Sequence, residues 1–363
     1  MGLAVVRSID APRRLVSQAD TEEFEQEIVD QHALAMVGAG LSDGYIDGER
    51  AAVFEFARFL GQPLWKATGA DADRYLTWLR RERGLSRTTV HRRAGAVGRF
   101  FEFMIARYQG DLHVLTGVVV VQPIDEFNRP ANTWSRSVRV PPDDDEVDQL
   151  FTGWSQALPD QRKYLTAARD YVAASLWRRA GLRLNETVML DLRDWRPDLG
   201  EHGKLHIRFG KGSRGRGPKT RLVPAINGVD AVLDWWLTDV RHQFGDDWDD
   251  PDAPLLPSER RDPISNRPGR AGADTLRSGL ADAVSRWLPA WRGRLSPHGL
   301  RHYCASSLYL QGLGLKAIQE LLGHEWLQTT TLYVHVHDDH IEQAWAQANQ
   351  RLTDRFGLPP QEG

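Results

Sequence analysis

The sequence predicts a mainly α-helical protein with a small β-sheet, built as two domains. The chain has 363 residues, which is more than one ordinary domain needs. Apolar side chains recur at helical spacing through most of the first 110 residues. Two short segments rich in β-forming residues flank a glycine-rich basic turn at 210–219. With 41% hydrophobic residues and 13 Trp, the chain can build large cores in both domains.

The first predicted element is an acidic amphipathic helix over residues 20–37. Three helices with clearer apolar faces are expected after it, because apolar side chains repeat there at steps of three and four residues. The expected ranges are 49–60, 71–83 and 87 to about 108. Ser86 is a good N-cap for the last of these helices. This part of the chain is therefore predicted to be a small helical bundle.

The last helix of this bundle carries basic side chains mostly outside its apolar stripe, and we expect them to face a partner: Arg87, His91, Arg92 and Arg99. Residues 48–110 contain twelve basic residues and six acidic ones, whereas residues 1–47 contain three basic and nine acidic. A basic face suits a polyanion such as DNA, but charged runs are more often solvated faces. The net charge of −3 leaves both interpretations open.

Prolines and arginines between residues 122 and 142 predict an extended linker. The second domain opens with an acid-rich helix start at 143–146, and another helix is expected over 162–180. Strands are expected at 204–209 and 220–223, a surface loop at 246–270, and helices from 274–288 on to about 354. The predicted borders are an acidic extension at 1–45, a helical domain at 46–112, a linker at 113–142, a second domain at 143–336 and a tail at 337–363.

The composition excludes several classes of protein. No stretch approaches the roughly 20 consecutive apolar residues of a membrane span. The N-terminus lacks the charged start and apolar core of a secretion signal. The single cysteine, Cys304, excludes an internal disulfide and any multi-cysteine metal site. We therefore expect a cytoplasmic protein without a membrane partner.

Polar residues able to bind a phosphate gather in the second domain. Ser296 and Pro297 start a predicted helix, and His298 and Arg301 lie three residues apart near its positive end. A later helix closes at Gly323, which is followed by His324 and, nine residues further on, by Tyr333.

Two more charged groups lie upstream of this helix. Arg183 occupies a helix–loop–helix junction with Glu186 three residues later, and Lys211 lies in the turn between the two predicted strands. Taken singly, each residue has an ordinary structural explanation, such as a buried Arg183–Glu186 ion pair. Together they suit attack on a phosphodiester, because a phenol needs a base and cations that stabilise the developing charge.

These residues resemble the catalytic motif of the tyrosine recombinase (phage integrase) family. That motif comprises an Arg in a GLR-x-x-E box, a Lys in a β-hairpin, H-x-L-R, LGH and a Tyr nine residues beyond that histidine. The chain matches all five parts in order and spacing, within about residues 165–335. The resemblance implies a helical core-binding (SAM-like) domain followed by an α/β tyrosine-recombinase catalytic domain.

The resemblance also implies how bonds and protons move. Tyr333 would attack the scissile phosphate and form a 3′-phosphotyrosyl link. Lys211 would be the general acid for the 5′ hydroxyl, although Lys204 and Lys219 flank the same turn. His298 would assist proton transfer with the nucleophile. Two rounds of cleavage and rejoining through a Holliday junction would exchange the strands without ATP, metal or other cofactor.

Further residues would bind the DNA. By the same resemblance, Arg183 and Arg301 would clamp the phosphate oxygens, and His324 would hydrogen-bond the phosphate. Glu186 would buttress Arg183 from behind. Besides the basic side chains of the bundle, Arg214 and Arg216 in the hairpin turn are candidate DNA contacts.

The implied partner is double-stranded DNA carrying attachment or recombination sites, bound by a homo-tetramer in which the C-terminal helix docks on a neighbouring protomer. We expect a nucleoid-associated enzyme serving a mobile element such as a prophage, transposon or integrative element, with accessory or directionality proteins. Alternatives are a type IB topoisomerase-like relaxing enzyme and a catalytically inert DNA-binding regulator. A fourth is a metal-dependent hydrolase centred on His335, His337 and His340, for which we prefer a solvated segment and no metal.

Overall fold

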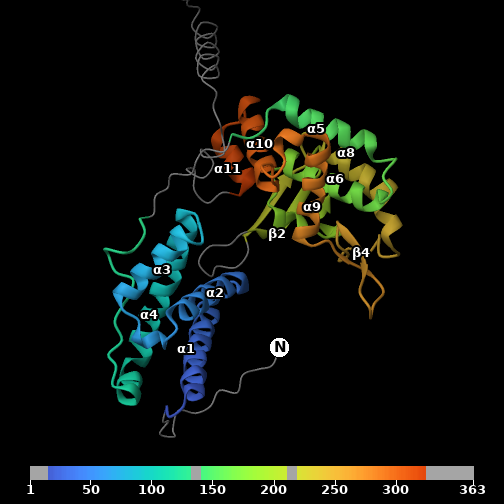
Figure 1. Cartoon of the computed structure of the whole chain (residues 1–363). Helices are drawn as coiled ribbons and strands as arrows, with labels where there is room; N and C mark the ends of the chain where they lie inside the picture. Colours follow the sequence, from blue (N-terminus) through green and yellow to red (C-terminus); the bar gives the residue numbers. More distant parts are fainter. Residues whose placement is uncertain (1–14, 132–139, 211–218, 324–363) are drawn as a thin grey trace, which may run out of the picture. The chain divides into compact units, whose positions relative to one another are not determined.

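The computed structural model describes residues 15–131, 140–210 and 219–323, which fall into two compact units (Figure 1). Residues 15–131 belong to the first unit, and the other two ranges belong to the second. Each unit has its own hydrophobic core. Within the described ranges, no helix combines the length and the apolar character needed to cross a membrane.

The first unit is a helical bundle, as predicted. Its elements are α1 (Gln18–Gly38), α2 (Asp43–Leu60), the short 3₁₀ segment η1 (Leu64–Lys66), α3 (Gly69–Arg81) and α4 (Arg87–Thr116). Ser86 caps α4 by accepting a hydrogen bond from the backbone N–H of Thr89, which confirms the predicted N-cap. Helix α4 is longer than its apolar stripe indicated, and it ends at Gly117 in the left-handed conformation.

The acidic helix α1 is part of this bundle. A reciprocal capping box between Ser17 and Asp20 starts it. Its buried side chains Phe24, Ile28 and Val29 belong to the same core as the apolar residues of α2, α3 and α4. The acidic helix is therefore a packed part of the bundle, and the predicted border between residues 45 and 46 falls inside α2.

The segment after α4 also lies against the bundle. Val120 and Ile124 are buried in the first core. The Gln122 side-chain amide donates to the carbonyl of Gly98 at 3.0 Å. The described part of the segment that sequence patterns predicted to be an extended linker is thus anchored on the first unit as far as residue 131.

The second unit surrounds a small sheet with helices (Figure 1). Its helices are α5 (Asp144–Ala157), α6 (Tyr164–Arg179), α7 (Leu184–Val188), α8 (Val229–Trp235), α9 (Ala273–Trp287), α10 (Pro297–Leu310) and α11 (Leu315–Leu322). Short 3₁₀ and π segments are η2 (Leu192–Asp194), η3 (Trp236–Val240), η4 (Arg241–Phe244) and η5 (Pro289–Trp291). The strands are β1 (Trp195–Arg196), β2 (Lys204–Gly210), β3 (Lys219–Pro224), β4 (Pro257–Arg261) and β5 (Pro268–Arg270).

The antiparallel sheet has the order β1–β2–β3. Strands β2 and β3 confirm the two predicted strands, and Ile207 pairs with Arg221 while Gly210 pairs with Lys219. The two-residue strand β1 was not predicted, because two residues are too few to show an alternating pattern. Alternate residues of β2, Leu205 and Ile207, point into the core.

The prediction of a surface loop at 246–270 was wrong. Strands β4 and β5 form a hairpin in this segment, and Leu255 and Leu256 just before it are buried. The abundance of Asp, Pro and Arg hid a short apolar pair and two strands that begin with proline, a residue that strand edges tolerate.

Helix α6 is the centre of the second core. Val172, Ala173, Leu176 and Trp177 are fully buried there, and the helix packs against α8, α9 and α10. The indole N–H of Trp177 donates to the Thr187 hydroxyl at 2.9 Å, so α6 is tied to α7 by a buried hydrogen bond.

We predict that Trp177→Phe lowers the free energy of unfolding by roughly 1–3 kcal/mol, because it leaves a cavity and removes the donor to Thr187. Urea unfolding followed by circular dichroism measures the change. The control is Trp248→Phe, since Trp248 is 57% exposed and its loss should cost no more than about 0.5 kcal/mol. Equal effects of the two substitutions would contradict the assigned packing.

Candidate active site

Arg183 lies at the start of α7, where the chain turns after α6. Its backbone N–H donates to Glu186 Oε2 at 2.8 Å, and its Nη1 donates to Glu186 Oε1 at 2.7 Å. The carboxylate three residues into the helix therefore caps the backbone and pairs with the side chain at once. This confirms the predicted Arg183–Glu186 contact and shows why the spacing is three residues.

Glu186 is the centre of a larger cluster. Arg221 of β3 donates to both of its oxygens, Nη1 to Oε1 at 2.9 Å and Nη2 to Oε2 at 2.8 Å. Nη1 of Arg301, from α10, lies 4.0 Å from Oε2. Three guanidinium groups from three separate elements thus surround one carboxylate that is 2% exposed. We call these four residues the arginine cluster.

The arginine cluster keeps Glu186 ionised. Burial alone would raise the pKa of this carboxyl, but the hydrogen-bonded Arg221 and then Arg183 outweigh it and lower the pKa from 4.5 to about 2. One negative charge faces three positive ones, so the site has positive charge in excess. A partly buried place with excess positive charge attracts an anion.

The end of α11 fixes the same three arginines. Arg221 Nε donates to the carbonyl of Leu321 at 3.0 Å, Arg301 Nη2 to that of Leu322 at 2.8 Å, and Arg183 Nη2 to that of Gly323 at 3.0 Å. Carbonyls at a helix C-terminus have no partner within the helix and carry partial negative charge. Each of these three consecutive carbonyls therefore accepts from a different arginine.

Two glycines let these elements approach one another. Gly323 ends α11 with φ +66°, as the sequence predicted for the turn before His324. Gly181 has φ +61°, its carbonyl accepts from Arg301, and a Cβ there would lie 2.4 Å from Leu322. Backbone with positive φ favours glycine, and here the space does too.

Helix α10 presents both Arg301 and His298. Ser296 accepts from the backbone N–H of Gly299 at 3.2 Å and Pro297 is the first helical residue, which confirms the predicted helix start. Arg301 is 1% exposed and points into the cluster, whereas His298 is exposed and lines a cavity of about 500 Å³. The rings of His298 and His302 meet edge to face at 4.8 Å.

The structure thus brings together Arg183, Glu186 and Arg301 from among the predicted residues. Five other predicted residues lie outside the described residues: Lys211, Arg214, Arg216, His324 and Tyr333. Lys211 directly follows the end of β2, and His324 directly follows Gly323. The sequence prediction missed Arg221, and the only local signal for it was its place in a strand beside the basic turn.

The basic residues of α4 differ from one another. Arg87 and Arg92 are exposed, while His91 Nδ1 lies 2.7 Å from the carbonyl of Pro130. Arg99 is 45% exposed and also paired, since its Nε and Nη2 donate to Glu49 at 2.9 and 2.7 Å; its contact with DNA stays a prediction. Glu49 is 4% exposed, so burying its carboxylate requires this pairing.

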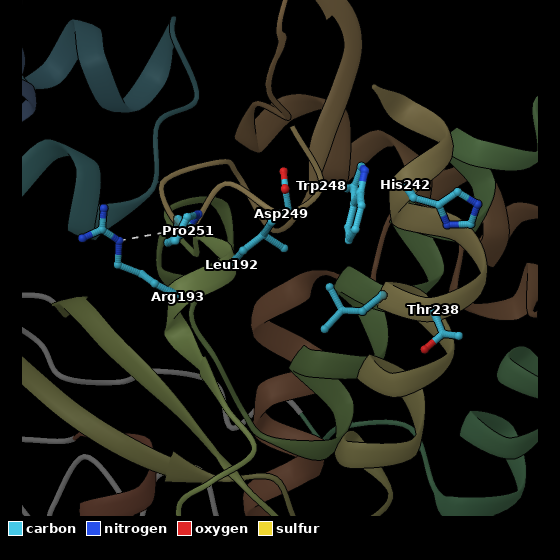
Figure 2. Close-up of a pocket in the computed structure, with 8 residues that line it drawn as sticks. Leu192, Arg193, Thr238, His242, Trp248, Asp249 and Pro251 are labelled. Carbon is cyan, nitrogen blue, oxygen red and sulfur yellow. Dashed lines mark hydrogen bonds between the residues drawn. The ribbon is translucent and has the colours of Figure 1, made fainter. Parts of the chain in front are cut away.

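A larger cavity of about 820 Å³ lies elsewhere in the second unit (Figure 2). Figure 2 shows Trp248 and Asp249 beside Leu192, with Thr238 and His242 on the neighbouring helical segment. The lining of this cavity includes no member of the arginine cluster. Among the residues that the structure describes, no group of three or more potential ligands could bind a metal ion. The tail histidines His335, His337 and His340 lie outside this part of the chain.

The fold is that of tyrosine recombinase catalytic domains. A structure of the XerH site-specific recombinase bound to a palindromic difH substrate matches with a TM-score of 0.62 at 18% identity, covering 91% of this chain and 84% of that one. A structure of the Tn1549 transposon integrase with transposon right-end DNA matches with a TM-score of 0.60 at 16% identity, covering 88% and 99%.

Sequence comparison leads to the same class. Tyrosine recombinase XerC of Vibrio vulnificus is 27% identical over 298 residues, covering 82% of this chain and 81% of that protein. XerC of Histophilus somni is 28% identical over 294 residues, covering 79% and 83%. Residues 143–340 match the model of the phage integrase family. The chain therefore belongs to the phage integrase family and is a tyrosine recombinase.

We predict that Gly181→Ala lowers both stability and activity. A left-handed alanine costs about 1–2 kcal/mol, and its Cβ must also displace Leu322, whose carbonyl holds Arg301. The control is Gly200→Ala, which has φ +76° but only ordinary contact with Lys204 at 3.6 Å. Thermal unfolding and DNA cleavage measure the two effects. If both variants cleave equally well, the packing of Leu322 does not matter for Arg301.

Proposed function

We propose that this chain is a site-specific recombinase that cuts and rejoins duplex DNA through a 3′-phosphotyrosyl intermediate, with strand exchange through a Holliday junction. The observation that carries the proposal is the arginine cluster with its excess positive charge. A phosphodiester gains negative charge as its phosphorus becomes five-coordinate, and guanidinium groups fit its non-bridging oxygens. The anion for which the cluster is built is then the scissile phosphate.

In each step of the proposed reaction one phosphate ester bond is replaced by another. The Tyr333 oxygen bonds to phosphorus and loses its proton with the help of His298. The bond from phosphorus to the 5′ oxygen breaks, and Lys211 protonates that oxygen. Arg183 and Arg301 bind the phosphate oxygens, and His324 donates a further hydrogen bond. A 5′ hydroxyl then attacks the phosphotyrosine and releases Tyr333, so no external energy source is consumed.

We infer the setting of this reaction from the same family. The substrate is double-stranded DNA with defined recombination sites, bound by a homo-tetramer, and accessory proteins set the direction. The similarity to a transposon integrase supports service to a mobile element. Arg87 and Arg92, exposed on α4, are the described residues that we expect to contact the DNA backbone.

The first test is covalent capture. The protein is incubated in EDTA with DNA carrying a nick beside the cleavage site, so that the released fragment diffuses away. We expect a protein–DNA adduct with wild type and none with Tyr333→Phe, since the phenol oxygen is the nucleophile. Denaturing electrophoresis of labelled DNA detects it.

Other outcomes of the same assay favour the alternatives. Relaxed supercoils without recombined product would indicate a type IB topoisomerase-like enzyme. DNA binding without any adduct would indicate a catalytically inert regulator. Activity that EDTA abolishes would favour a metal-dependent hydrolase. Recombined product between two sites is the result that supports exchange.

We predict that Arg301→Lys slows adduct formation roughly 10²–10³-fold. A single ammonium cannot hold the carbonyls of Gly181 and Leu322 and also offer a fork to the phosphate. The control is Arg277→Lys, because Arg277 is more than half exposed and pairs with nearby Asp274, away from the arginine cluster. Single-turnover cleavage rates measure the loss, and near-normal cleavage by the Arg301 variant would contradict its role.

A further inference from the structure

We propose that Arg221 is a positioning residue for DNA cleavage. It fixes Glu186 and, through Glu186, Arg183, and it joins the strand after the Lys211 turn to the end of α11 just before His324. The inference rests on the proposed function, because it concerns the same arginine cluster. It assigns a role to a residue outside the five motif parts that the sequence showed.

Arg221 acts through protein groups. Each nitrogen of its guanidinium donates to a protein acceptor: Nε to Leu321, Nη1 to Glu186 Oε1 and Nη2 to Glu186 Oε2. Its side chain is 14% exposed, against 26% for Arg183. Three of its five N–H groups are thus held by Glu186 and by the end of α11, the same two places that hold Arg183. Its effect on a phosphate is therefore expected to pass through the groups that it orients.

The position of Arg221 on β3 lets it fix the strand pair that leads to Lys211. It stands opposite Ile207 on β2, and the pairing shifts register before Gly210 meets Lys219. Lys211 is the next residue after Gly210. The bond from Arg221 to Glu186 therefore fixes the base of the hairpin that carries Lys211 relative to Arg183.

The other end of the Arg221 side chain lies against the turn that leads to His324. A Cβ at Gly323 would lie only 3.0–3.1 Å from atoms of the Arg221 side chain. The carbonyl of Leu321 accepts from Arg221 two residues before that turn. From β3, this one side chain thus contacts two elements next to proposed catalytic groups: α7, which begins at Arg183, and α11, which ends just before His324.

Loss of Arg221 should change the charge of Glu186. Burial raises the pKa of this carboxyl and Arg221 is the main group that lowers it. In the wild type the pKa of about 2 keeps the carboxylate ionised at neutral and mildly acid pH. Without Arg221 the pKa should rise, so that lowering the pH protonates Glu186 and releases Arg183. Cleavage by the variant should therefore show an acid limb from Glu186 in addition to any acid limb that His298 gives the wild type.

The experiment compares Arg221→Met and Arg221→Lys with Arg208→Met. Arg208, on β2 of the same hairpin, pairs with Asp191 and Asp194 and touches no member of the arginine cluster. Single-turnover adduct formation on the nicked DNA is measured between about pH 5 and about pH 8, together with DNA binding by mobility shift and with thermal unfolding.

We expect Arg221→Met to slow cleavage roughly 10–10²-fold at neutral pH, with binding changed less than about threefold and a new acid limb in its pH profile. Arg221→Lys should recover part of the rate and remove most of the acid limb, because it restores the charge but not the fork. Arg208→Met should lower the unfolding temperature while keeping the wild-type rate and pH profile.

Two results would overturn the inference. One is Arg221→Met cleaving with the wild-type rate and pH profile. The other is Arg208→Met reproducing its acid limb, which would reduce Arg221 to general support of the hairpin. If Arg221→Met does not fold, Arg221→Lys decides alone, and a wild-type rate for it counts against the role. Absence of an adduct with the wild type would instead refute the proposed function.

Discussion

A single buried carboxylate organises the catalytic unit of this recombinase. Glu186 is 2% exposed, and an ion so placed is costly unless it is paired and hydrogen-bonded. Arg183 and Arg221 supply the bonds, and Arg301 adds its charge from 4.0 Å. Since these residues come from α7, β3 and α10, compensating one charge requires three elements to meet. The geometry of the proposed phosphate site follows from the need to compensate this buried charge.

The end of α11 makes this arrangement rigid. Three consecutive carbonyls at the helix terminus each accept from one arginine. The arginines are therefore held between a carboxylate and a helix terminus before any DNA is bound. Such preorganisation matters for catalysis, because donors that need not reorient stabilise developing charge at no cost during the reaction. The excess positive charge leaves the arginines repelling one another in the free protein, and a bound phosphate would reduce this repulsion.

The sequence predicted the local parts of this site and missed the part that depends on long-range pairing. Arg183 with Glu186, and the start of α10 with Ser296, lie within one helical turn, where spacing determines contact. Arg221 reaches Glu186 only because β2 and β3 pair in one register, and single-chain spacing does not contain that register. For the same reason the sequence did not predict the ion pair of Arg99 with Glu49, which comes from another helix. The prediction for residues 246–270 was wrong for a different reason: their polar composition indicated a loop, although the segment contains two short strands.

The three arginines also differ in exposure, and this difference bears on the roles proposed for them. Arg183 is 26% exposed, Arg221 14% and Arg301 1%. A charge near the surface can bind an oxygen directly but is weakened by water, whereas a charge with almost no exposure acts through a medium of lower dielectric constant. We therefore expect Arg183 to make the adaptable contact with DNA and Arg301 to supply the stronger field. On this argument we expect Lys at position 301 to fail because it loses the two carbonyl bonds that hold the charge in the arginine cluster, even though the charge itself is retained.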